Sequence, residues 1–223
     1  MLMPTVSRPP MAITLAVTKD ISLPPLTALL ALQRAEEPQT PVCIHEIMLS
    51  DLCPGLSSGR YNAVIALRAD AMTECSSESL WHDELALALP VCSPLLAGAE
   101  ITIDMLQSYK ALLWPQAART ALGGQIAALV EDAGSEAAAS SFELMATLVA
   151  AGYCVGIAPR SRIMQARGWG IVLRPLADGP HRLTTKLLRA RRHCLPAVER
   201  FVERAQRIAA DHPQGHERGA GWT

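Results

Sequence analysis

The sequence predicts an α/β fold in which helices pack on mostly parallel sheets. Short apolar runs of strand-forming residues alternate with amphipathic helical segments, the pattern of parallel strands joined by right-handed crossovers. Hydrophobic residues make up 50% of the 223 residues, enough to build well-buried cores. Only 4% of the residues are aromatic. The core must therefore consist mainly of Leu, Ala, Val and Ile, which suits helices packed on a parallel sheet.

The first third of the chain shows the clearest alternation of strand and helix. A helix is expected over 24–36, because Ser22 can cap it and prolines are tolerated in a first helical turn. A shorter helix over 51–58 is expected to stop at Gly59, a plausible left-handed terminator. The strands that separate these helices are expected at 12–17, 42–47 and 63–67.

The rest of the chain continues the alternation with shorter signals. Ser140 and Glu143 form the spacing of a capping box, which predicts a helix that Gly152 closes. Pro196 suits the first turn of a last helix. A short helix from Leu106 and a helix over 125–133 complete the helical segments. Strands are expected at 85–89, 111–114, 155–159, 171–173 and 184–188.

Charge and cysteine content exclude several classes of protein. The formal net charge is −1, whereas a nucleic-acid-binding domain usually shows a basic face. The one dense basic run, 189–193, is read as a solvated strand end or loop. The six cysteines, none in a C-x-x-C pair, are expected to be buried thiols in a reducing cytoplasm. No signal sequence or membrane span is recognised, so a cytoplasmic protein is expected.

Several short motifs suggest catalytic or metal sites but lack the context that such sites need. Gly55–Gly59 matches G-x-S-x-G, yet a nucleophile elbow needs a strand immediately before it and a helix immediately after it. His212 and His216 are separated by Pro213 and Gly215, which deny them a shared helix face. His45 and His82 are expected to be ordinary, partly exposed residues. We therefore expect no enzyme activity, metal or cofactor.

Four segments, in order over about 200 residues, resemble a known family. Leu23-Pro24-Pro25-Leu26 follows the first strand. Residues 56–65 resemble L-x-x-G-x-x-D-x-x-I, with Asn62 in place of Asp. Residues 89–97 resemble P-x-x-H-P-L-A, with Ser93 in place of His. The most specific segment, 148–159, resembles L-V-A-A-G-x-G-I-x-x-x-P with its glycine pair displaced slightly. We expect the departures at Asn62 and Ser93 to affect structure rather than function.

Together these segments resemble the effector-binding region of LysR-type transcriptional regulators. The resemblance implies the type 2 periplasmic-binding-protein fold, two lobes joined by two crossover strands. Lobe I would comprise 11–88 and 185–211, and lobe II would comprise 89–184, with irregular tails at 1–10 and 212–223. An effector would bind between the lobes, since ligands of open α/β sheets bind at the carboxyl ends of strands near helix N-termini.

The candidate effector-binding residues follow strands or open helices. Free backbone N–H groups at helix starts, together with hydroxyls, suit a carboxylate or a similar anion. Lys19 or Arg68 could add a charge-assisted hydrogen bond, whereas Ser140 has first a capping role and Trp114 is expected to line a core or cleft wall. The full set is Thr18, Lys19, Ser50, Leu67, Arg68, Trp114, Gln116, Ser140, Ser141 and Phe142.

The resemblance implies a sensing and oligomerising domain of a transcription regulator. Its effector would be a small molecule, and the resemblance suggests a small organic or aromatic acid. The family's antiparallel dimer would place 24–36 against 125–133, in a homodimer or a tetramer. DNA would be bound only through an N-terminal domain that the ten or so residues before the first strand cannot form. The chain would then be either an excised piece or a natural relative without that domain.

Two alternatives stay open at this point. The first is a free-standing solute-binding protein or an enzyme on the same fold, although no export signal or catalytic motif is recognised. The second is a cysteine-based redox sensor of the same family, which needs an exposed thiol of low pKa with a resolving partner. Cys154 is expected to be buried and inert, whereas the basic run before Cys194 could lower its pKa.

Overall fold

The computed structural model describes residues 12–19, 21, 23–67, 75–114, 139–179, 181–190 and 195–211. The chain divides into two compact units. Unit 1 comprises Met1–Leu80 and Lys186–Pro213, and unit 2 comprises Trp81–Thr185 and Gln214–Thr223. The lobe boundaries expected from the sequence stay predictions. None of the described helices combines the length and apolar character that a bilayer crossing requires.

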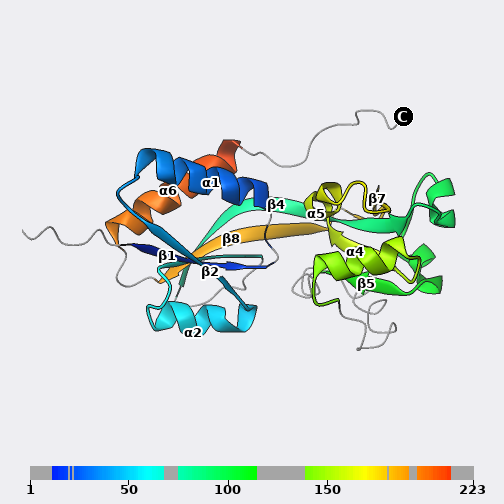
Figure 1. The fold of residues 1–223 in the computed structure, drawn as a ribbon, viewed down its shortest axis with the longest axis horizontal. Coiled ribbons are helices and arrows are strands. Elements are labelled where there is room, and N and C mark those ends of the chain that lie inside the picture. The colour runs from blue at the N-terminus through cyan, green and yellow to red at the C-terminus, as the bar shows by residue number, and fades with distance from the viewer. Residues whose placement is uncertain are drawn as a thin grey trace, which may run out of the picture. The chain divides into compact units, whose positions relative to one another are not determined.

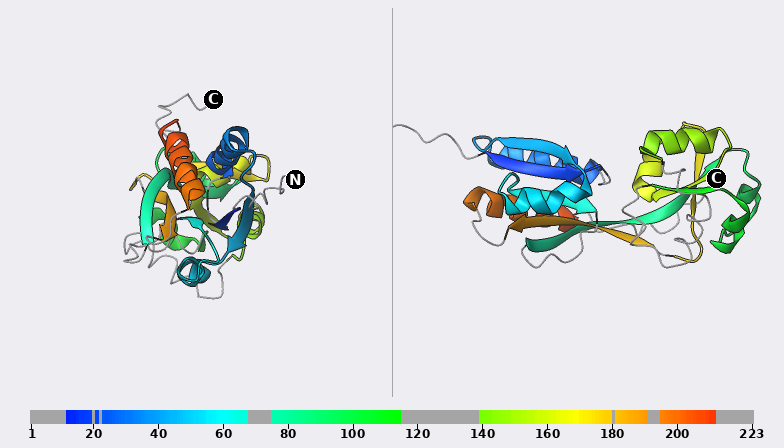
Figure 2. Two further views of the ribbon diagram at one scale, coloured as in Figure 1. Left: turned by 90° about the vertical axis from the view of Figure 1, so that its left-hand side faces the viewer. Right: turned by 90° about the horizontal axis from the view of Figure 1, so that it is seen from below.

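Unit 1 is built on three parallel strands covered by helices on both faces. β1 (Ile13–Thr18) pairs in parallel with β2 (Val42–Ile47) and with β3 (Ala63–Leu67). The helices α1 (Leu23–Glu36) and α6 (Pro196–Asp211) lie together on one face, and α2 (Leu52–Ser57), preceded by the 3-10 turn η1 (Leu49–Asp51), lies on the other (Figures 1 and 2).

Alternation along the strands explains how unit 1 fills both layers of its core. Ala16, Val64 and Ala66 belong to one buried cluster with Leu52 and Leu56 of α2. Successive side chains of a strand point to opposite faces. The intervening residues Leu15 and Ile65, which are also fully buried, therefore point to the face that α1 and α6 cover. Strands buried on both faces read as continuous apolar runs, and these runs made them recognisable in the sequence.

Unit 2 has a small mixed sheet. β5 (Ala111–Leu113) is parallel to β6 (Val155–Pro159), whereas β4 (Cys75–Pro90) is antiparallel to both β6 and β7 (Ile171–Pro175). One core cluster joins this sheet to two helices, α4 (Phe142–Ala150) and α5 (Arg160–Gln165). Two 3-10 turns, η2 (Pro94–Ala97) and η3 (Asp104–Ser108), connect β4 to β5.

Two strands contribute residues to both units. β4 passes from unit 1 to unit 2, and β8 (Arg182–Ala190) returns. The strand order is β2-β1-β3-β8-β4-β6-β5, with β7 paired to β4. The prediction of an α/β fold with two crossover strands is therefore confirmed. The parallel pairs β1–β2, β1–β3 and β5–β6 stand at the two ends of this strand order, and the antiparallel pairs of β4 make the sheet mixed.

The expected elements match the structure with three differences. β4 begins at Cys75 rather than at residue 85. Its first half was not expected, because most of its residues are polar and at least partly exposed and it has no apolar run. α5 was not expected, since it has six residues and only Ile163 is buried. The short helix expected from Leu106 is instead the 3-10 turn η3. The expected helix over 125–133 lies outside the described residues. Gly59 ends the α2 segment with φ 72°, as predicted.

Candidate functional site

The carboxyl ends of β1 and β3 place Thr18 and Leu67 at one edge of the unit 1 sheet. Both residues are buried, and Thr18 has only 4% of its surface exposed. The Thr18 hydroxyl has no hydrogen-bond partner among the described residues. Leaving a buried hydroxyl unsatisfied costs roughly 1–3 kcal/mol. This hydroxyl is therefore a candidate contact for a polar ligand.

The other predicted site residues of unit 1 are not gathered around Thr18 by any contact in the structure. Lys19 is exposed, and its Nζ lies 3.5 Å from the Glu46 carboxylate on β2. Such an exposed pair leaves the ammonium largely solvated. Ser50 is exposed in η1. Arg68, which directly follows β3, lies outside the described residues.

In unit 2, Trp114, Ser141 and Phe142 meet at the carboxyl edge of β5 and β6. Trp114 follows β5, and its ring packs edge-on against Phe142 with 5.4 Å between the centroids. The Ser141 hydroxyl accepts a hydrogen bond from the Leu144 N–H at 3.2 Å, so Ser141 is the N-cap of α4. Both rings are buried. The predicted residue Gln116 lies outside the described part of the chain.

The capping role expected for Ser140 is wrong by one residue. Ser140 is exposed, and the capping hydroxyl belongs to Ser141, whose extended backbone precedes the first helical turn. The N-cap is the residue immediately before the first helical residue. Because α4 begins at Phe142, that residue is Ser141 and not Ser140. The Ser140–Glu143 spacing therefore matched a capping box without forming one. Thr147 also donates a hydrogen bond to the Glu143 carbonyl at 2.8 Å.

Arg162 is a site residue that the sequence reasoning missed. It lies on α5, just after the carboxyl end of β6, and its guanidinium carbon lies 5.2 Å from the Trp114 ring centroid and 5.3 Å from that of Phe142. Its Nη2 lies 3.5 Å from the Glu143 carboxylate, and its Nε has no partner among the described residues. Trp114 was selected because it directly follows a strand. The same criterion, applied to the residues after the strand at 155–159, would have found Arg162.

The cation and the rings together define the chemistry of this edge. Trp169, which is half exposed, extends the aromatic surface, with 6.3 Å between its centroid and that of Phe142. A guanidinium on aromatic faces is held by cation–π attraction. It can still form the planar, bidentate pair that a carboxylate accepts. The edge of unit 2 therefore suits an organic acid, above all one with a ring.

Asp83 is a partly buried carboxyl beside the same edge. It accepts hydrogen bonds from the Ser161 hydroxyl and backbone N–H and from the Glu84 N–H. Burial raises the pKa of the Asp83 carboxyl, although these hydrogen bonds act in the opposite direction. Asp83 thereby fixes the start of α5, the helix that carries Arg162.

The comparisons with known proteins decide the family. The family model described as the LysR substrate binding domain matches residues 8–210. This chain belongs to the LysR substrate binding domain family. Its fold is accordingly the periplasmic-binding-protein-like fold of type 2, and the family is one of effector-sensing regulatory domains. The resemblance drawn from the four sequence segments is confirmed.

Solved structures agree with the fold of this LysR domain. A full-length BenM mutant has TM-score 0.78 and 17% identity, covering 96% of this chain and 72% of its own. A reduced OxyR from N. meningitidis has TM-score 0.75 and 16% identity, covering 91% and 95%. The BenM effector binding domain with its effector benzoate has TM-score 0.74 and 16% identity, covering 93% and 96%. No curated protein sequence is similar enough to count as a match.

The structure locates the G-x-S-x-G match and His82 in the LysR domain. Ser57 is exposed at the end of α2, which follows a 3-10 turn and not a strand. A Cβ on Gly55 would lie 2.3 Å from the Tyr61 ring, so this glycine serves packing. The Nδ1 of His82 lies 2.9 Å from the Thr184 hydroxyl. The described residues contain no cluster of three or more potential metal ligands, and His212 and His216 lie outside them.

The cysteines differ from the expectation of buried thiols. Cys43, Cys53 and Cys92 are exposed, while Cys75 and Cys154 are buried. Burial raises the pKa of the Cys154 thiol to about 11, which confirms that Cys154 is buried and unsuited to act as a thiolate. The exposed cysteines lie on β2, on α2 and after β4. Cys194 lies outside the described residues.

The basic run at the end of β8 also differs from the solvated strand end that was expected. The Arg189 guanidinium is mostly buried and pairs with Glu199 of α6 and with Glu78 of β4. This residue therefore ties the last helix to the sheet of unit 1. Residues 191–193 of the run lie outside the described part of the chain.

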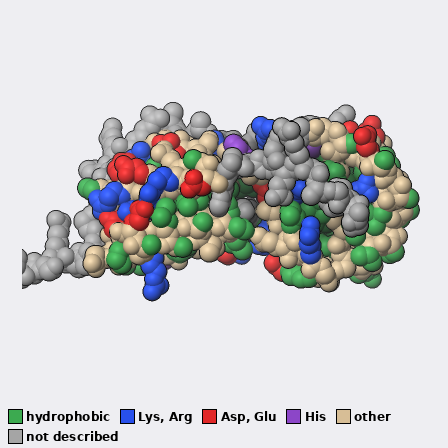
Figure 3. Space-filling view, turned by 90° about the horizontal axis from the view of Figure 1, so that it is seen from above, with side chains coloured by type: hydrophobic (Ala, Val, Ile, Leu, Met, Phe, Trp, Pro, Cys, Tyr) green, Lys and Arg blue, Asp and Glu red, His purple; other side chains and the backbone are tan. Residues whose placement is uncertain are grey.

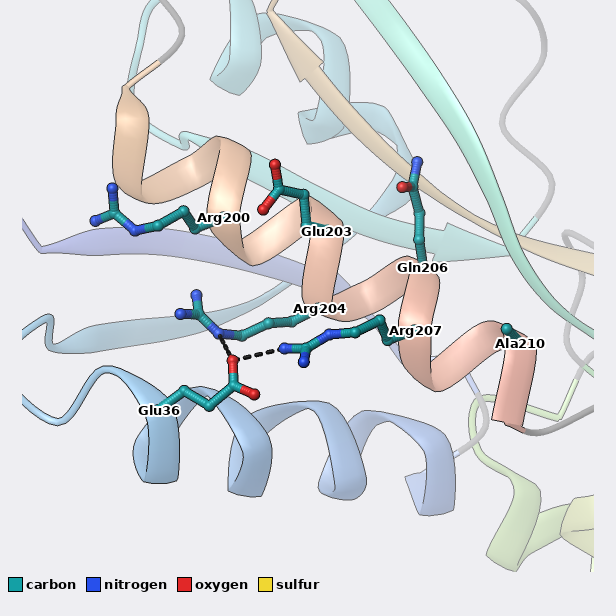
Figure 4. A pocket seen from close by; sticks show the side chains of 7 residues that line it. All are labelled: Glu36, Arg200, Glu203, Arg204, Gln206, Arg207 and Ala210. Atoms are coloured by element: carbon teal, nitrogen blue, oxygen red, sulfur yellow. Dashed lines mark hydrogen bonds and ion pairs between the residues drawn. The ribbon is translucent and has the colours of Figure 1, made fainter.

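A hollow of about 580 Å³ lies along α1 and α6, lined mainly by charged side chains (Figure 4). Acidic and basic groups stand side by side on this face (Figure 3). Glu36 pairs with Arg204 at 2.8 Å and with Arg207 at 2.5 Å, and Arg204 also reaches Glu37 at 2.9 Å. The basic groups are thus satisfied within the protein, and the hollow is part of a helix–helix contact.

Proposed function

We propose that this LysR domain senses a small organic acid, and that an aromatic acid is the preferred class. The observation that carries the proposal is the buried Thr18 hydroxyl at the end of β1, which has no partner among the described residues. A small-molecule oxygen or carboxylate would satisfy it. Family membership supports this interpretation, because the matching model is that of a substrate binding domain.

The unit 2 edge supports the chemical class of the effector. Arg162 supplies a cation that a carboxylate needs, and Trp114, Phe142 and Trp169 supply aromatic surface. Among the structurally similar proteins, a BenM domain is described as binding its effector benzoate. We extend that class of ligand to this chain. Ser141 and Arg162 are the candidate polar contacts in unit 2, and Thr18 is the candidate polar contact in unit 1.

The proposed mechanism is a shift in population. An effector that binds one conformation of the domain more tightly than another raises the share of that conformation in proportion to the difference in affinity. In an oligomer, the change would reposition DNA-binding arms, as the family implies. We propose a homodimer as the basic assembly, with tetramers built from it. DNA would be contacted through a separate DNA-binding domain.

The test is a thermal-shift screen of the purified chain against benzoate, other aromatic acids and small aliphatic acids. A ligand that binds only the folded state, present at about 100 times its Kd, stabilises it by roughly 2.7 kcal/mol. We expect a dose-dependent rise in Tm with an acid, and its loss in Thr18→Val and in Arg162→Gln. Thr147→Val is the matched control, because the Thr147 hydroxyl is exposed and bonds only within α4.

Two outcomes would count against the proposal. The absence of a shift with every acid would show that the domain does not respond to this class. A shift that Thr18→Val and Arg162→Gln both leave unchanged would place the ligand elsewhere. Incubation of the bound acid with the domain, followed by product analysis, tests the alternative of an enzyme on the same fold, since a sensor returns its ligand unaltered.

A further inference from the structure

A small cavity of about 120 Å³ lies within unit 2, where β6 and β7 end and β8 begins. Its polar side chains are Glu84 of β4, Arg160 at the start of α5, and His181 just before β8. Backbone pairing fixes their positions. Leu85 lies opposite Pro159 in the β4–β6 register, and the Leu85 N–H donates to the His181 carbonyl at 2.9 Å. Three distant parts of the chain are therefore held around one small space.

The remaining wall of the cavity is apolar. Ala86 lies opposite Pro175 in the β4–β7 register, and Ala88 lies opposite Leu173, so these residues share one face of the sheet. That face carries the core of unit 2, against which Leu173 packs. Leu176, which is buried, also lines the space. One side of the cavity is thus apolar and fits a short aliphatic group.

The polar groups that line the cavity lack partners within the described chain. The Nε2 atom of His181 is buried and makes no hydrogen bond. The Glu84 carboxylate and the Arg160 guanidinium form no hydrogen bond or ion pair with described residues, including each other. A ligand with a charge of each sign would pair with both groups at once, whereas a simple anion would leave Glu84 unpaired beside it.

We propose that this cavity binds a small zwitterionic α-amino acid, as a second ligand site of the domain. The ligand carboxylate pairs with Arg160 and accepts from His181 Nε2–H, in the tautomer with the proton on that atom. The ammonium group pairs with Glu84, and the side chain contacts Leu173 and Leu176. A cavity of about 150 Å³ accommodates benzene. The smaller space here, about 120 Å³, selects amino acids of the size of glycine, alanine or serine.

The site is separate from the proposed organic-acid site. None of the residues that line the cavity is Thr18, Ser141 or Arg162. The domain would therefore respond to two chemically different small molecules. Arg160 is two residues from Arg162 on α5, and Asp83 anchors the same helix through Ser161. A ligand that holds Arg160 would accordingly influence the helix that presents Arg162.

Isothermal titration calorimetry of the full chain with glycine, L-alanine and L-serine tests the proposal. Propionate and ethylamine, which each carry one of the two charges, serve as fragment probes. We expect saturable binding of at least one amino acid, and binding at least about tenfold weaker in Arg160→Gln and in Glu84→Gln, because each loses a charge-assisted hydrogen bond. Arg167→Gln and Glu100→Gln are the matched controls at exposed positions and should bind as the parent does.

The two charge variants should also differ from each other. Glu84→Gln should discriminate less between L-alanine and propionate, whereas Arg160→Gln should lose both. His181→Phe keeps a ring and removes the nitrogen, so it should weaken amino-acid binding without loss of fold, as checked by Tm. The proposal is overturned if no amino acid binds saturably, or if both charge variants bind like their controls. Amino-acid binding lost in Thr18→Val but retained in Arg160→Gln would also overturn it, and would assign that ligand to the first site.

Discussion

Asn62 shows how one side chain can secure the sheet of unit 1. Its Oδ1 accepts a hydrogen bond from the Thr14 N–H at 2.7 Å, and its own N–H donates to the Thr14 carbonyl at 2.8 Å. We predict that Asn62→Ala lowers the free energy of unfolding by about 1–2 kcal/mol, because the Thr14 N–H loses its acceptor. Asn62→Asp should retain most of the stability, since a carboxylate accepts the same bond.

Urea denaturation followed by circular dichroism measures both variants. Ser57→Ala, an exposed position on α2, is the control and should leave the midpoint unchanged. An Asn62→Ala variant as stable as this control would show that the side-chain bond contributes nothing. The same experiment explains why Asp and Asn can exchange at this position of the family pattern.

Asp83 predicts a dependence of stability on pH. Burial raises the pKa of the folded Asp83 above its unfolded value, so the folded chain retains the proton to higher pH. The contribution of this group is therefore fully present below the unfolded pKa, about 3.9, and is lost as pH rises through the raised folded pKa. Asp83→Asn cannot ionise, so its stability relative to the parent should increase as pH rises from about 4 to 7.

Unfolding curves of the parent and of Asp83→Asn, recorded across this pH range, give the difference directly. Comparing differences removes the contributions of other titrating groups, which both proteins share. A difference that stays flat with pH would mean that Asp83 ionises in the folded protein as readily as in the unfolded chain.

At the site, sequence reasoning could find residues whose role follows from local position. Thr18, Trp114 and Phe142 were selected because they follow a strand or open a helix, and the structure buries all three at those places. Arg162 is different, because its importance comes from rings 48 and 20 positions earlier in the chain. Ser140 was misplaced because two adjacent serines offer the same hydroxyl, and only backbone geometry decides which one caps α4.

At the scale of elements, α1 and α6 are joined by a network of charged side chains around Arg204. Arg204 has 7% of its side chain exposed and contacts Gln33, Glu36 and Glu37. We predict that Arg204→Ala lowers the free energy of unfolding by about 3 kcal/mol, because removing one partner of a buried pair leaves the other uncompensated. Arg200→Ala, at an exposed position, should cost less than about 1 kcal/mol.

The same network gives the Arg204 prediction a dependence on pH. Hydrogen bonds from Arg207 and Arg204 lower the pKa of Glu36, and contacts with Arg200 and Arg204 lower that of Glu37 although burial opposes them. Groups of lowered pKa stabilise the fold above their unfolded pKa, and this stability is lost as pH falls through the folded pKa. The destabilisation by Arg204→Ala should therefore shrink below about pH 4.5, the ordinary value for Glu. A difference in the free energy of unfolding between the parent and Arg204→Ala that stays constant with pH would contradict this prediction.

Elements were predictable where burial on both faces produced continuous apolar runs. β1 and β3 are of this kind, as is β6. The first half of β4 could not be found this way, since most of its residues are polar and at least partly exposed and its pairing is decided by distant strands. α5 is too short for a helical period to appear, and its position depends on the hydrogen bonds from Ser161 to Asp83.

At the scale of the molecule, each unit has its own buried core, and β4 and β8 belong to both units. Unit 1 also exposes large apolar residues along one segment. Ile44 is 47% exposed, Met48 62% and Leu49 46%, and β2 is the edge strand of the sheet. An exposed edge strand with apolar side chains is a common surface for association. We infer that this segment belongs to the interface of the proposed homodimer.

We predict that Ile44→Asp converts the proposed homodimer to a monomer, because a charge within an apolar interface must be desolvated without a partner. Sedimentation velocity over a range of concentrations measures the change. Val91→Asp, at a residue of unit 2 that is 63% exposed, is the control and should leave the dimer intact. Ile44 lies on a partly exposed strand, so an unchanged Tm at low protein concentration shows that the fold survives the substitution. If the parent sediments as a dimer and Ile44→Asp does the same, the dimer forms through another surface. A parent that sediments as a monomer would contradict the proposed homodimer itself.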